Sequence, residues 1–140
     1  MSLDWIRVSL RGFGGDAPIG HGFFEALGLE NARDLLLRPS DEPDVAASVV
    51  LFEVAMENVI SAPERAEAFA ASVRNGFAGA AARLGALRRE AFDAWRAAGR
   101  HADVFVSGWL DDQQFDLEVP GEFLRACGEL GLPMTICTND

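Results

Sequence analysis

The chain has 140 residues, of which 49% are hydrophobic, 24% charged and 9% aromatic, and this composition excludes disordered, collagen-like and coiled-coil classes. Its net charge of -10 comes from 22 acidic residues against 12 arginines. The acidic balance argues against nucleic acid as a partner, and the absence of lysine excludes Schiff-base and P-loop lysine chemistry.

The first half of the chain predicts two strands and one short helix. Residues 5–10 alternate between apolar and polar and predict a strand that runs into a glycine-containing loop. Residues 22–27 predict a short helix. Residues 47–56 predict a central strand, because both of its faces are mostly apolar. One face is expected to carry Ser48, Val50, Phe52, Val54 and Met56, and the other Val49, Leu51, Glu53 and Ala55.

The second half predicts helices, a hairpin and a closing strand. A capping-box pattern at 61–64 begins a helical stripe that continues to Gly99, as one helix kinked at Asn75-Gly76 or as two helices broken there. Residues 102–110 and 114–119 alternate on either side of a polar turn and predict an antiparallel hairpin. A helix ended by Gly131 and a strand at 134–138 follow.

The predicted order is therefore β-α-β-α-β-β-α-β. No linker divides the chain, so we expect residues 1–140 to form a single α+β domain with a mixed or antiparallel sheet, helices mainly on one face, and in part a ferredoxin-like arrangement. No apolar run of about 20 residues predicts a membrane span, and no pattern resembles a secretory signal. A cytoplasmic location is the resulting expectation.

Two cysteines and one glutamate are the candidate reactive groups. Cys127 and Cys137 are too few for a disulfide framework, so buried thiols are expected, although one bridge between them is geometrically possible. Cys127 falls on the apolar face of a predicted helix, where burial lowers thiol reactivity. Glu53, within an apolar strand, would act as an acid or base if buried; exposure or pairing with an arginine is the favoured interpretation.

Residues 12–17 fit a relaxed dinucleotide-binding pattern, G-x-G-x-x-A, after a strand. We reject this interpretation because Pro18 and the glycines that follow would fall in the helix that must bind the pyrophosphate. Gly14, Asp16, His21 and His101 are instead the candidate residues of a small-molecule or divalent-cation pocket. No spacing of His or Cys typical of a zinc or iron site is present, so no metal, cofactor or catalytic residue is predicted.

Arginines concentrate on the stretch between residues 83 and 100. They predict either a solvated helix face or a contact with an acidic surface of a second copy. Arg88 and Arg89, with the aromatic residues Trp5 and Trp109, are the candidate interface residues.

The C-terminal third carries a recognisable pattern. An alternating strand, Val104-Phe105-Val106-Ser107-Gly108-Trp109, is followed by Phe115-Asp116-Leu117, by Glu122-Phe123-Leu124 and by Leu130-Gly131-Leu132. This pattern resembles the end of the bacterial domain-of-unknown-function family 4279. The resemblance covers about half of the chain, and the ending at Thr138-Asn139-Asp140, where an aromatic residue is expected, departs from it. It implies an α+β fold and no established activity.

These observations favour a non-enzymatic, acidic protein-interaction module in a bacterial cytoplasm. Small acidic domains of this kind include immunity proteins that neutralise toxins, where negative charge steers binding to a basic partner. We expect a protein partner, with a homo-oligomer as a further option, and neither nucleic acid nor membrane. The alternative is a small-molecule or divalent-cation binding domain.

Overall fold

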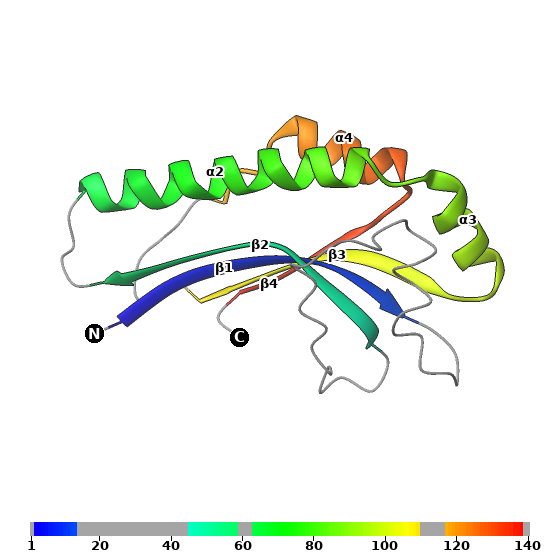
Figure 1. Ribbon diagram of the computed structural model, residues 1–140. Helices are drawn as coiled ribbons and strands as arrows, with labels where there is room; N and C mark the ends of the chain where they lie inside the picture. The colour runs from blue at the N-terminus through cyan, green and yellow to red at the C-terminus, as the bar shows by residue number, and fades with distance from the viewer. Residues whose placement is uncertain (1, 14–44, 59–62, 110–116, 139–140) are drawn as a thin grey trace.

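A computed structural model describes residues 2–13, 45–58, 63–109 and 117–138. Its elements in chain order are β1 (Ser2–Phe13), β2 (Val45–Asn58), α2 (Pro63–Gly85), α3 (Arg89–Ala97), β3 (His101–Trp109), α4 (Gly121–Glu129) and β4 (Met134–Thr138). The four strands form one sheet in the order β2-β1-β3-β4. β1 runs antiparallel to both of its neighbours, and β4 runs parallel to β3 (Figure 1).

Helices α2 and α4 lie over one face of this sheet, and α3 lies at the end of the sheet where β3 begins (Figure 1). The expected fold class is therefore confirmed: the chain is an α+β protein with a mixed sheet and helices mainly on one face. None of the described helices is long and apolar enough to cross a membrane.

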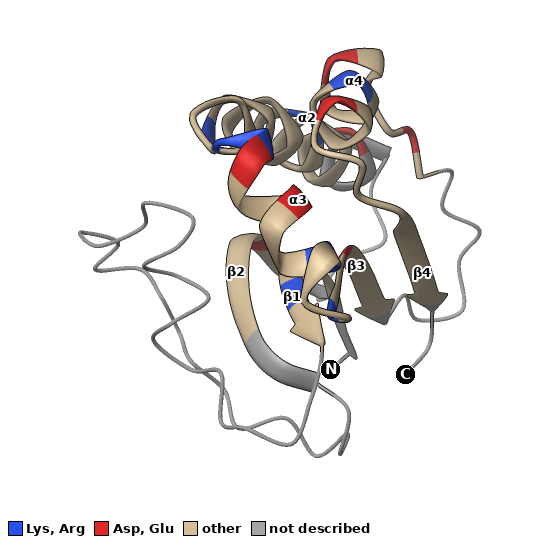
Figure 2. Cartoon of the chain, turned by 90° about the vertical axis from the view of Figure 1, so that its right-hand side faces the viewer, with Lys and Arg blue, Asp and Glu red and all other residues tan. Residues whose placement is uncertain are grey.

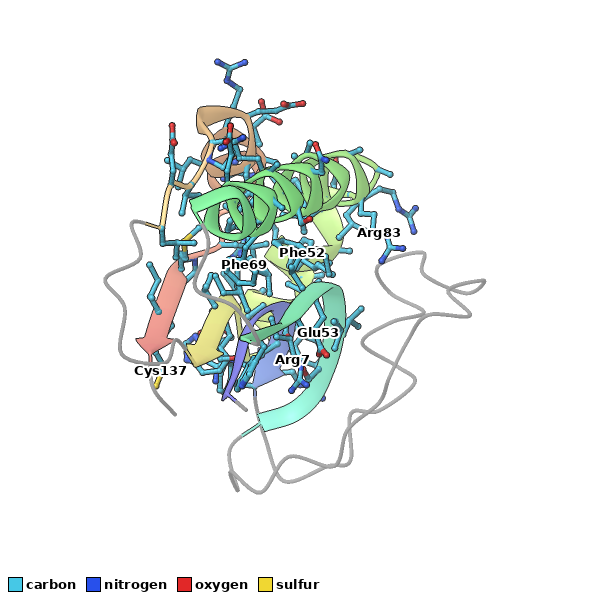
Figure 3. All side chains as sticks on the ribbon, turned by 90° about the vertical axis from the view of Figure 1, so that its left-hand side faces the viewer. Arg7, Phe52, Glu53, Phe69, Arg83 and Cys137 are labelled. Carbon is cyan, nitrogen blue, oxygen red and sulfur yellow. The ribbon has the colours of Figure 1, made fainter. Side chains whose placement is uncertain are left out.

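The core lies between the sheet and the two covering helices. Strand alternation places Ile6, Val8 and Leu10 of β1 on the helix side, and all three are buried. The helices contribute large aromatic side chains to the same layer. Phe77 of α2 is fully buried, with its ring centroid 5.0 Å from that of Phe52 in β2 and 4.8 Å from that of Phe123 in α4. Figure 3 shows Phe52 lying between α2 and the sheet.

Strand β2 differs from its prediction in place and in facing. Among the described strands it lies at the edge of the sheet, next to β1, and is not central. The pairing register with β1 shifts between Val8 and Ser9, which leaves Leu51 as the extra residue of a β-bulge. Before the bulge, odd-numbered residues of β2 face the core, and Val49 pairs with Leu10. After the bulge, even-numbered residues face the core, and Phe52 pairs with Val8. The single alternation expected for 47–56 is wrong because a bulge adds one residue to one strand.

Helix α2 runs through Asn75-Gly76 without the expected kink or break. The chain leaves the helix only after Gly85, and α3 starts at Arg89. Gly76 is required by packing rather than by backbone geometry, because a Cβ at this position would overlap the ring of Phe52. A glycine within a helical pattern indicates either a break in the helix or the close approach of another group. At Gly76 it is the close approach of the Phe52 ring.

Replacing Gly76 with alanine is expected to lower the free energy of unfolding by about 1–3 kcal/mol, because the Phe52 ring must move. Gly79, three residues further along the same helix, serves as the matched control, because a Cβ added there would have no neighbouring atom within 4 Å. Gly79→Ala is expected to stabilise by about 0.5–1 kcal/mol through helix propensity alone. Urea denaturation of both variants measures the contrast, and equal effects would contradict the packing role of Gly76.

The expected hairpin after β3 is not formed by the described residues. β3 has β1 on one side and β4 on the other, so both of its edges are occupied. Leu117, Glu118 and Val119, in the segment expected to pair with β3, are not in a strand. The chain passes instead into α4 and then returns as β4. Between them lies Gly131, whose backbone φ is +68°. The expected closing helix and strand are confirmed.

Candidate functional site

The residues predicted for a ligand pocket are only partly placed. Gly14, Asp16 and His21 lie outside the described residues. His101 is the first residue of β3, where its side chain is exposed and its Cα pairs with that of Phe13. No group of three or more His, Cys, Asp or Glu side chains able to hold a metal ion occurs in the described ranges. The pocket and the absence of a cofactor stay predictions.

The four predicted interface residues fall at two places. Trp5 and Trp109 are direct Cα partners across β1 and β3. Arg88 and Arg89 lie at the start of α3, near the opposite end of the sheet, where β3 begins (Figure 1). The structure thus brings the tryptophans together and places the arginines at a separate surface.

Helix α3 is held firmly by its inner face. Phe92 and Trp95 are buried, and the Trp95 indole N–H donates to the carbonyl oxygen of His101 at 2.7 Å. Arg89 donates to the carbonyl oxygen of Glu129 at 2.8 Å and Arg96 to that of Leu130 at 3.1 Å. These acceptors are carbonyl groups at the end of α4, where a cation also complements the helix dipole. Part of the predicted basic face therefore links α3 to the end of α4. Figure 2 colours the arginine positions of the chain blue.

Beside this packed face, α3 carries a groove of about 690 Å³. It is lined by Arg88, Glu90, Ala91, Ala94, Trp95, Ala98 and Arg100. The three alanines recur at three- and four-residue spacing, so they form one small-residue face of the helix. Trp95 is almost buried, and its ring contributes the apolar floor. We call this surface the α3 groove.

Charged side chains stand at the two ends of the α3 groove. Arg88 and Glu90 are exposed at its start, and within the described ranges neither makes an ion pair. At the other end, the Arg100 guanidinium lies over the Trp95 ring, 4.6 Å from its centroid. The groove thus combines apolar lining with the exposed charges of Arg88 and Glu90 and with Arg100, which is held on Trp95.

The face of the sheet opposite α2 and α4 carries a buried ion pair. Arg11 of β1 donates to both carboxylate oxygens of Asp103 in β3, at 2.8 and 2.6 Å, and Thr135 donates to the same carboxylate at 2.9 Å. The Arg11 guanidinium also lies 3.9 Å from the centroid of the Phe105 ring. Because the Asp103 carboxylate is paired with Arg11 and bonded to Thr135, the cluster stabilises the sheet.

Glu53 is exposed and accepts a hydrogen bond from Arg7 at 2.5 Å. The favoured interpretation of this residue, exposure and pairing with an arginine, is confirmed. Figure 3 shows the pair on the side of the sheet away from α2. An exposed, paired carboxylate on an edge strand has none of the desolvation that an acid–base residue needs.

Neither cysteine forms a disulfide; Cys127 is buried in α4 and Cys137 is half-buried in β4. Burial raises the pKa of the Cys127 thiol to about 11 from an ordinary value of 9.0. The thiolate is the nucleophile, so Cys127 is unsuited to covalent chemistry at neutral pH, as the sequence predicts.

Cys127 is expected to react slowly with a thiol reagent such as iodoacetamide. At pH 9 about one Cys127 thiol in a hundred is ionised, given its raised pKa. Its burial also couples folding to pH: the unfolded chain loses this proton above about pH 9 and the folded chain only near 11. Stability from this group is thus constant below pH 9 and falls between pH 9 and 11. Mass spectrometry of labelled peptides, with Cys137→Ser as a background, measures the rate; rapid labelling of folded protein would contradict it.

The α3 groove is only partly visible in the sequence. Arg88 is a predicted interface residue, but Ala91 and Trp95 continue an apolar core stripe, and Glu90 and Arg100 fit a solvated face. The signal is the run of alanines around Trp95. Alanine is common on both buried and exposed helix faces, so spacing alone does not separate a groove from a core.

Comparison with known proteins identifies no relative of this chain. No family model, no curated protein and no solved structure matches the chain. The resemblance to family 4279 stays a prediction, and function has to be argued from the site itself.

Proposed function

We propose that this chain is a non-enzymatic protein-interaction domain and that the α3 groove is part of its binding surface. The observation that carries the proposal is the α3 groove, where three alanines and Trp95 lie between Arg88 and Glu90 at one end and Arg100 at the other. A small-residue helix face lets another backbone approach closely, and charges at its ends give orientation. The inner face of the same helix is fixed to α4, so the surface is preorganised.

Three groups among the described residues that could support catalysis have other partners or are protonated. Asp103 is bound by Arg11 and Thr135, Glu53 is bound by Arg7, and Cys127 is protonated at neutral pH. These assignments favour an interaction role over an enzymatic one.

The distribution of charge supports a partner with a basic surface. The described ranges contain ten arginines and eleven acidic residues, so they are almost neutral. The remaining two arginines and eleven acidic residues lie in the other segments, which therefore hold nearly all of the negative charge. An excess of negative charge steers association with a basic protein. An immunity-like role in a bacterial cytoplasm fits this chemistry.

Position-specific cross-linking tests the proposal. A benzophenone amino acid placed at Ala94 in the groove is expected to give a discrete protein adduct on irradiation in cell extract, and excess unlabelled chain should suppress it. The matched control is the same amino acid at Ala78, which is exposed on α2 and outside the groove. No adduct at Ala94, or identical adducts at both positions, would overturn the proposal.

One observation favours the alternative of a small-molecule site. The groove volume of about 690 Å³ lies within the range of ligand pockets, roughly 300–1,000 Å³. A thermal-shift screen of the folded chain against divalent cations and nucleotides discriminates the two functions. A shift of several degrees that Arg88→Ala abolishes would favour the ligand-binding function.

A further inference from the structure

We draw no further inference here: the strongest candidate, the β4 edge of the sheet with the exposed apolar side chains of Ile136 on β4 and Leu124 on α4, carries nothing because nothing in the described part of the chain shows what covers it.

Discussion

Phe77→Ala is expected to lower the free energy of unfolding by about 3–5 kcal/mol, one of the two largest effects of any single substitution proposed for this chain. The Phe77 side chain is fully buried, and its ring packs edge-to-face with Phe52 below it and with Phe123 of α4 beside it. Its removal therefore opens a cavity where α2, α4 and β2 meet. Urea or thermal denaturation followed by circular dichroism measures the loss.

Leu124→Ala is the matched control for this effect. Leu124 lies on α4 next to Phe123, but half of its surface is exposed. Its truncation is expected to cost less than about 1 kcal/mol, since little apolar area leaves the core. Similar losses for the two variants would show that the aromatic cluster is not the centre of the core.

Asp103→Leu is also expected to lower the free energy of unfolding by about 3–5 kcal/mol. The cause here is the loss of a buried ion-pair partner, and not the opening of a cavity. Its carboxylate accepts two hydrogen bonds from Arg11 and one from Thr135, and the side chains of both ion-pair partners are about nine-tenths buried. The substitution removes the carboxylate with which the buried Arg11 cation is paired. Chemical denaturation across a double-mutant cycle measures the coupling.

The second variant in that cycle is Arg11→Met. The double substitution is expected to recover most of the stability lost in Asp103→Leu, because no uncompensated charge remains. The comparison pair lies on the same sheet: Arg7 and Glu53 also form an ion pair, but their side chains are 23% and 41% exposed. Glu53→Gln is therefore expected to cost less than about 1 kcal/mol. A small effect of Asp103→Leu would contradict the buried-pair account.

Much of the framework could be predicted from local patterns. The alternation in residues 5–10 and 102–108 identifies the core-facing residues of β1 and β3, because a strand buried on one face repeats every two residues. Gly99 and Gly131 mark helix ends, and both adopt the positive φ that glycine tolerates. These signals are local, so no knowledge of the partner elements is needed.

The errors arise where distant residues decide. The β2 bulge cannot be seen in the strand itself, because it is a relation between β2 and β1. A hairpin was expected after β3 because the next segment is its nearest neighbour in the sequence. In the structure β3 pairs instead with β1 and with the parallel strand β4, which are further away in the sequence.

Local sequence is thus sufficient for the α+β class, the inward face of the central strands, the helix that closes the fold and the inert character of Cys127. Hydrophobic periodicity and side-chain chemistry are properties of short segments, and they survive in any arrangement of those segments. The packed molecule was needed to show that Gly76 admits the ring of Phe52, that Arg11 and Asp103 meet in a buried pair, and that Arg89 and Arg96 turn to α4 while Arg100 lies over the ring of Trp95. Each of these depends on residues brought together from distant parts of the chain, and no local pattern encodes the distance between them.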